Sequence, residues 1–265
     1  MLGFLIKKTF FDTWDNLFQI LLINIGFYIP IGLIVIFSPL TGIGIPDSSI
    51  PIVISIPACF ILLSILFIYS SGSSALAKDF VNYKTINFHN FWLAIKEGYQ
   101  SCLLCAAINA IYFILCRNAL IFYSNLEQLI LSTVATIILG WITFSWLLAM
   151  QFFFPVHSQL DKNPRKIFKK MLLLFIDNTK LHVFLAFGSI IILLISLITG
   201  GILPGIGAVF IFQNSALKLI LFKYDYLEEN PTVNRNKIPW DALLIDERNK
   251  IGKRTLRGMI FPWKE

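Results

Sequence analysis

The chain of 265 residues is far more apolar than a soluble domain: 57% of its residues are hydrophobic, 14% are charged, and its mean hydropathy is +0.75. This composition excludes an ordinary soluble protein, in which about a quarter of the residues are charged. The net charge of +7 does not indicate nucleic acid, because the basic residues flank apolar runs, where they set orientation and contact the anionic headgroups of a lipid bilayer.

Six apolar stretches are long enough to cross a bilayer, whose hydrocarbon core of about 30 Å needs about 20 helical residues. They run at roughly 17–38, 50–70, 99–116, 129–154, 181–199 and 202–222. The predicted fold class is therefore all-α, an integral membrane bundle of six transmembrane helices arranged as three helical hairpins over residues 1–222. Lys7, Lys8 and Asp12 precede the first apolar run, so we expect that run to be an uncleaved anchor.

The basic residues lie almost entirely on one side of this predicted bundle. Twenty of the 22 Lys and Arg residues fall at the N-terminus, in the second and fourth connections, or in a tail over residues 223–265. Arg117 lies on the other side, and Lys218 lies near the inner end of the sixth span, where it can snorkel. The positive-inside rule then predicts that both termini are cytoplasmic. We expect a bacterial cytoplasmic (inner) membrane, since the richness in Phe, Ile and Asn is typical of an AT-rich bacterial genome.

An amphipathic segment precedes each predicted hairpin on the inner side. The three segments are 4–18, about 88–98, and 164–176. Asn163 followed by Pro164 predicts the start of the third helix, because asparagine is a favoured N-cap and proline suits the first helical position. Asn87 offers the second segment a similar cap.

The third amphipathic segment has the clearest pattern. Its apolar residues repeat at helical spacing and its lysines occupy the opposite face. Such a helix either dips its apolar face into the membrane interface or packs on the spans as an elbow, and the pattern leaves both open. Its basic residues are candidate contacts for lipid headgroups or for a protein partner: Arg165, Lys166, Lys169 and Lys170.

Polar side chains within the predicted spans are few. Asn24, Asn109, Gln213 and Asn214 are the candidate residues for lining a pathway between the helices. The Gly- and Pro-rich turn over 199–207 is predicted to be an outer turn of the bundle. The segment 205–216 that leads back from it is either a broken helix along such a path or a site of close packing through small residues. No Asp or Glu lies within a span, which argues against a proton-coupled carrier.

The sequence contains no pattern typical of a membrane enzyme. It lacks the H-E-x-x-H, G-x-S-x-G and P-loop motifs, so we expect no catalytic residues, no bound nucleotide and no cofactor. Cys102 and Cys105 form a C-x-x-C pair, but a zinc site needs about four ligands and no second Cys or His pair lies nearby in sequence. These cysteines are therefore predicted to pack between helices.

The tail is predicted to be partly ordered. The sixth helix should continue through Leu227 and break at Asn230-Pro231, and a short helix is expected over 241–250. The chain ends on a cluster containing Phe261 and Trp263, which is unusual for a free tail. We expect Trp240, Phe261 and Trp263 to contact either the chain's own inner loops or a cytoplasmic or membrane protein partner.

One stretch resembles a known family. The small residues Ser73-Ser74-Ala75-Leu76-Ala77 are followed by the aromatic segment Asn87-Phe88-His89-Asn90-Phe91-Trp92 and by Lys96. This pattern is similar to that of the YesL-like family of uncharacterised bacterial multi-pass membrane proteins, and it covers about 70 residues of the chain. The resemblance implies association with a sugar-uptake system, and it implies no catalytic residues.

These observations favour a non-enzymatic membrane protein acting as an accessory or assembly component near a transport system. The alternative is a small-solute or lipid transporter, or permease subunit, whose pathway is lined by the four amide side chains named above. A membrane enzyme is disfavoured because no acidic residue lies within the spans.

Overall fold

The computed structural model describes residues 1–41, 51–85, 87–231, 238–252 and 254, and every regular element in these ranges is an α-helix. The predicted all-α class is therefore confirmed. The helices of the described residues are α1 (Leu2–Asp15), α2 (Leu17–Thr41), α3 (Ile52–Val81), α4 (Phe88–Ser124), α5 (Leu129–Met150), α6 (Phe153–Gln159), α7 (Pro164–Asp177), α8 (Thr179–Ile198), α9 (Gly205–Glu229), α10 (Trp240–Leu243) and α11 (Ile245–Ile251).

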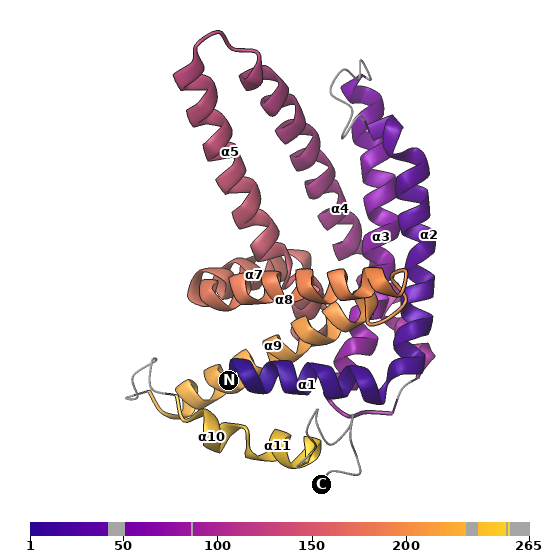
Figure 1. Cartoon of the computed structure of the whole chain (residues 1–265), viewed down its shortest axis with the longest axis vertical. Coiled ribbons are helices and arrows are strands. Elements are labelled where there is room, and N and C mark those ends of the chain that lie inside the picture. Colours follow the sequence, from indigo (N-terminus) through magenta and orange to yellow (C-terminus); the bar gives the residue numbers. More distant parts are fainter. Residues whose placement is uncertain (42–50, 86, 232–237, 253, 255–265) are drawn as a thin grey trace.

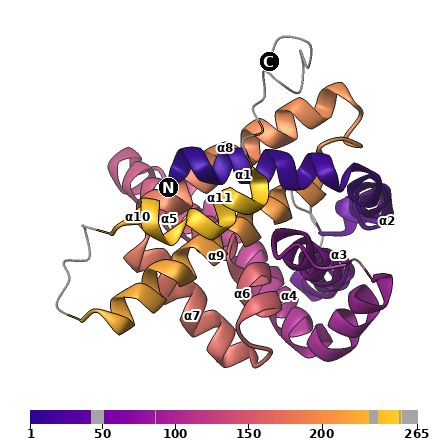
Figure 2. The same ribbon diagram turned by 90° about the horizontal axis from the view of Figure 1, so that it is seen from below.

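Six helical segments are long and apolar enough to cross a membrane, and they match the six predicted spans. They are α2, α3, α4, α5 continued by α6, α8 and α9. Helices α2 to α5 extend towards one end of the molecule, which we call the outer end (Figure 1). Figure 2 shows α2 and α3 end-on and α1, α7 and α8 from the side. The axes of α1, α7 and α8 are therefore roughly perpendicular to those of α2 and α3.

Most short helices gather at the opposite end of the molecule (Figure 1). We call α1, α6, α7, α10 and α11 together the basal layer. Helix α9 passes through it and is the most buried of the six long helices, with 78% of its most apolar stretch buried. It contacts α1, α2, α3, α6 and α8. The basal layer and α9 therefore form one packed body beneath α2 to α5.

Two helices differ in extent from the prediction. The segment 88–98 is not a separate elbow, because α4 continues without a break from Phe88 to Ser124. The fourth span instead breaks at Gln151 and Phe152, between α5 and α6. Proline has no N–H to donate, so Pro155 in α6 leaves the carbonyl of Gln151 without its helical partner and favours this break.

The predicted helix starts are confirmed. The side chain of Asn163 accepts a hydrogen bond of 3.1 Å from the N–H of Arg165, with Pro164 at the first position of α7. Asn87 accepts one of 2.9 Å from the N–H of His89 at the start of α4. The tail also follows its pattern, since α9 ends at Glu229 and α10 and α11 cover the predicted short helix.

The turn between α8 and α9 lies at an unexpected depth. It was predicted to be an outer turn, yet Asn24 donates to its carbonyls at Ile202 (2.7 Å) and Pro204 (2.9 Å). Asn24 is only seven residues into α2, about 10 Å along a helix that rises 1.5 Å per residue. The tip of this hairpin therefore meets the basal half of α2 and not its outer end at Thr41, because the hairpin crosses α2 and does not run beside it.

Glycines allow the helices of the basal half to approach closely. A Cβ added to Gly98 would lie 2.2 Å from the His157 ring, and one added to Gly72 would lie 2.6 Å from the Phe91 ring. A Cβ at Gly140 in α5, by contrast, would have no atom within 4 Å. Small residues at helix contacts are typical of packing within membranes, where close approach provides the attraction.

Candidate functional site

Lys8 of α1 is at the centre of a buried ion network in the basal layer. Its side chain is fully buried, and its ammonium lies 3.1 Å from Asp12 Oδ2 and 3.0 Å from Glu247 Oε2. It also donates to the carbonyl of Val81 at 3.1 Å and to the hydroxyl of Tyr83 at 2.8 Å. Burying an ammonium is costly unless its charge and its protons are matched, and here four oxygens from three elements match them.

Glu247 of α11 connects the tail to this network. It is 1% exposed, and its Oε1 accepts from Lys218 at 3.0 Å and from Lys250 at 3.3 Å. Lys218 also donates to the Val81 carbonyl at 3.1 Å. The expectation that Lys218 snorkels to water is therefore wrong: its partners lie inside the protein and leave its side chain 13% exposed.

The end of α3 contributes both a carbonyl and an unusual tyrosine. Tyr83 has φ of +55°, the left-handed conformation in which helices commonly end on glycine. The N–H groups of Tyr83 and Lys84 return to the carbonyls of Phe80 and Asp79, both at 3.0 Å. A side chain in this conformation costs about 1 kcal/mol. The ring offsets that cost, because the ammonium of Lys8 lies 4.2 Å from its centroid.

The pKa values of the ion network show which charges the fold favours. Burial raises the pKa of Asp12 to about 6, although Lys8 opposes the shift. Burial alone would also raise the pKa of Glu247, but Lys8 and Lys218 outweigh it and hold that pKa below its ordinary value. The pKa of Lys8 is raised, since Asp12, Tyr83 and Glu247 outweigh its desolvation. The network therefore favours an ionised Glu247 and only weakly tolerates an ionised Asp12.

A second network joins α3, α6 and α9 by neutral groups. Asn214 donates to Ser74 Oγ at 3.1 Å and accepts from Ser158 Oγ at 3.1 Å and from Gln159 Nε2 at 2.8 Å. Lys78 donates to the carbonyl of Ser158 at 2.8 Å. Each of these contacts lies between protein groups, so this network holds helices together in the interior.

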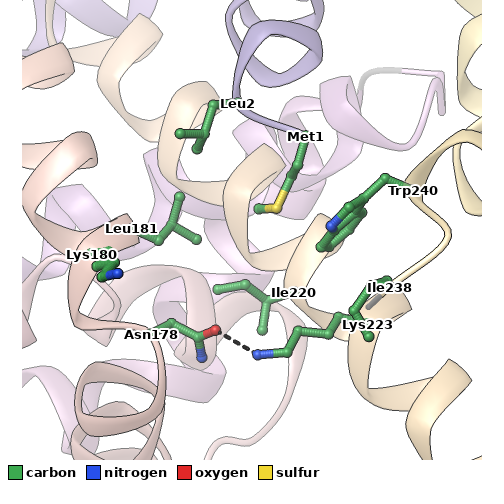
Figure 3. A pocket seen from close by; sticks show the side chains of 9 residues that line it. All are labelled: Met1, Leu2, Asn178, Lys180, Leu181, Ile220, Lys223, Ile238 and Trp240. Atoms are coloured by element: carbon green, nitrogen blue, oxygen red, sulfur yellow. Dashed lines mark hydrogen bonds between the residues drawn. The ribbon is translucent and has the colours of Figure 1, made fainter. Parts of the chain in front are cut away.

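A cavity of about 300 Å³ opens where the N-terminus, the tail and the start of α8 meet (Figure 3). One part of its lining is apolar and the other carries two lysines and an amide. Lys223 donates to Asn178 Oδ1 at 3.0 Å, and Trp240 lies across the cavity from Lys180 in this view. The lining residues are Met1, Leu2, Asn178, Lys180, Leu181, Ile220, Lys223, Ile238 and Trp240.

The four amides predicted to line a pathway occupy three different places. Asn24 binds the α8–α9 turn, where its Oδ1 also accepts from the N–H of Gly207 at 2.8 Å. Asn109 accepts from Trp146 Nε1 at 3.0 Å, between α4 and α5. Gln213 and Asn214 are buried on α9. Asn24, Asn109 and Asn214 thus make packing contacts, while the pathway assignment stays a prediction.

The predicted headgroup residues separate into three groups. Arg165, Lys166 and Lys169 are exposed on α7, and Lys166 and Lys170 lie 3.9 and 3.3 Å from Asp161. Trp240 lines the cavity described above. Phe261 and Trp263 lie outside the described residues. Beneath the lysines, Ile167 and Met171 are buried at 0% exposure, so α7 packs as an elbow on the rest of the protein.

The ion network is not predicted by the sequence pattern. The spacing of Lys8 and Asp12 by four residues was the visible signal, because such residues share a helix face. The partners Tyr83, Lys218 and Glu247 come from distant segments that a charge pattern does not connect. Comparison with protein-family models, curated proteins and solved structures finds no match to this chain.

Proposed function

We propose that this multi-pass membrane protein is a non-enzymatic accessory or assembly component of a transport system, and that it acts through its basal layer. The observation that carries the proposal is the ion network. Through Glu247 it fixes the tail to α1, α3 and α9, so the basal layer presents one preformed surface. A preformed surface binds a partner with less loss of conformational freedom than a mobile tail.

The orientation proposed for this surface is cytoplasmic. The helices of the basal layer and their connections carry Lys7, Arg165, Lys169 and Arg248, whereas Arg117 lies in the outer half of α4. Basic residues are retained on the cytoplasmic side during insertion. The resemblance of residues 73–96 to companions of sugar-uptake systems supports a transport partner in a bacterial inner membrane.

Contacts in the membrane interior support an accessory role over a transporter. The three asparagine side chains make hydrogen bonds to other parts of the protein: Asn24, Asn109 and Asn214. The cavity at the start of α8 is lined by different residues, none of them from the outer halves of α2 to α5. A polar pathway along the outer bundle would need groups that remain open to a solute.

The experiment is cross-linking of the tagged full-length protein in native membranes, followed by identification of its partners. Arg165→Glu and Lys169→Glu together should weaken the partner signal at least about fivefold, because both side chains are exposed on the basal surface. Gln128→Glu, at the outer turn between α4 and α5, is the control and should leave the signal unchanged. An equal loss in both variants, or solute flux by the purified protein that Asn214→Leu abolishes, would overturn the proposal.

A further inference from the structure

The cavity at the start of α8 combines cationic groups with an apolar wall. Lys180 and Lys223 contribute ammonium groups, and none of the described residues that line the cavity is acidic. Asp177 does not line the cavity, but its carboxylate lies 3.4 Å from the ammonium of Lys223. The same ammonium donates a hydrogen bond of 3.0 Å to Asn178 Oδ1. Figure 3 shows Met1 and Trp240 facing these groups across the cavity. This chemistry suits an anion that carries apolar groups.

The cavity lies where the lipid-facing surface of α8 begins. Farther along α8, Phe187, Ile191 and Leu194 are 64%, 56% and 58% exposed, which for a helix of this composition places them in the lipid. Lys180 precedes them in the first turn of the same helix. The ammonium groups therefore lie beside the exposed apolar surface of α8, and Trp240, a residue type that gathers at membrane interfaces, lines the same cavity.

We propose that this cavity binds the phosphate of an anionic phospholipid headgroup. Lys180 and Lys223 contact the phosphate, Trp240 covers it, and the acyl chains continue along the exposed apolar side chains of α8. Basic pockets beside membrane helices recognise anionic headgroups in this way. The inference rests on membrane embedding and not on the accessory role. Because N-terminal, α8, α9 and tail residues all line the cavity, a bound lipid would stabilise the closed basal layer.

The test is native mass spectrometry of the purified full-length protein in detergent, titrated with phosphatidylglycerol or with phosphatidylcholine. The protein should retain phosphatidylglycerol with about tenfold higher affinity, a difference that two ammonium groups at a headgroup can supply. Lys180→Glu should remove that preference. Lys96→Glu, an equal charge change at an exposed position of α4, should retain it.

A second variant separates the cavity from general surface charge. Leu2→Trp adds bulk at the mouth of the cavity without changing charge, and it should weaken phosphatidylglycerol binding as Lys180→Glu does. Equal retention of both lipids, or an equal loss in Lys96→Glu and Lys180→Glu, would overturn the proposal. So would displacement of the lipid by millimolar inorganic phosphate, which would show that the cavity takes a free anion. None of these results depends on the partner cross-linking described above.

Discussion

The basal layer and the outer part of the α4–α5 hairpin are built from the same kind of helix but held together differently. In α9, 78% of the most apolar stretch is buried, against 22% in the segment containing α5. Leu129, Ile130 and Trp141 of α5 are 78%, 82% and 66% exposed. Among the described residues, two hydrogen bonds of 3.0 Å link this hairpin, from Tyr112 to Thr143 and from Trp146 to Asn109. Two longer sulfur contacts of 4.0 Å join Asn109 to Met150 and Cys116 to Thr143.

This difference follows from the solvent that each region meets. Lipid covers the outer hairpin as well as another helix would, so few direct contacts are needed there. In the orientation proposed above the basal layer meets water and headgroups, where charged side chains are available and buried pairs can define one arrangement of distant segments. The comparison therefore assigns most of the stability to the basal layer, the region proposed to bind a partner, and each of the following experiments could break or sharpen it.

The largest effect is expected from Glu247→Gln. Removing one partner of a buried ion pair leaves the other charge unmatched and costs about 3–5 kcal/mol. Lys8, Lys218 and Lys250 all lose their shared carboxylate, so α11 should detach. Hydrogen exchange across residues 240–251 and thermal unfolding in detergent measure this.

Glu97→Gln is the control for that change, since Glu97 pairs with Lys162 at 3.9 Å on the surface. A surface pair contributes about 0–1 kcal/mol, so exchange in the tail should not change. If both variants behaved alike, the ion network would not hold the tail.

Gly98→Ala should destabilise the basal half by about 2–3 kcal/mol, since overpacking forces side chains out of place. The added Cβ would overlap the His157 ring, which is 1% exposed and has little room to move. Gly140→Ala in α5 meets nothing within 4 Å and should be neutral or stabilising by about 1 kcal/mol, because alanine favours helix. The two melting temperatures, measured side by side, compare the regions directly; equal shifts would break the comparison.

Asn24→Ala should loosen the α8–α9 hairpin. It leaves the carbonyls of Ile202 and Pro204 and the buried N–H of Gly207 without their partner, at about 1–3 kcal/mol. A cysteine placed at Leu203 should be poorly labelled by an impermeant maleimide from either side of the membrane, and should be labelled faster in the Asn24→Ala background. Rapid labelling from the outer side in the parent protein would contradict the depth of this turn.

The pH dependence of stability is expected to separate Asp12 from Glu247. The folded state raises the pKa of Asp12 to about 6. Between about pH 4 and 6 the folded protein therefore holds a proton on Asp12 that the unfolded chain has released. The contribution of Asp12 to stability falls as the pH rises through this range. The pKa of Glu247 is lowered in the folded protein, so the contribution of Glu247 to stability is lost as the pH falls through that pKa. Asp12→Asn should remove the first effect, on the order of 2 kcal/mol.

Thermal unfolding of the parent and of Asp12→Asn between pH 5 and 8 measures this difference. The variant should be at least as stable as the parent at pH 8, and should lose that advantage at pH 5. A variant that is several kcal/mol less stable at pH 8 would show that the ion network needs the Asp12 charge.

Local patterns predict much of this fold, and long-range contacts explain what they miss. Asn163 and Pro164 specify the start of α7 because a cap acts on its own first turn. Six apolar runs predict six helices for the same reason. Hydropathy measures the length of an apolar segment and not its depth in the molecule. It therefore predicts that the Gly- and Pro-rich turn after α8 lies at the outer end, whereas the structure places this turn beside Asn24.

The sequence pattern does not predict the ion network, because most of its members are far apart in the chain. Lys8 and the Val81 carbonyl are 73 residues apart, and Glu247 lies in a tail of mixed charge that is typical of a solvated segment. Trp240 is predicted as a contact residue because an aromatic residue beside a turn is a local signal. In the structure it lines the cavity. The lysines with which it shares that cavity come from α8 and α9, which only the folded structure brings to it.

The smallest effect is expected in the outer hairpin. Thr143→Val removes the acceptor for the Tyr112 hydroxyl and the longer contact with Cys116, both of which link α4 to α5. Hydrogen bonds within membranes average about 0.6 kcal/mol, because the groups find other partners when the helices separate. Tryptophan fluorescence during unfolding should register a change of that size, well below the change for Glu247→Gln. If Thr143→Val were the more damaging of the two, the outer hairpin would depend on its polar links and not on lipid, and recognition would have to be sought there as well.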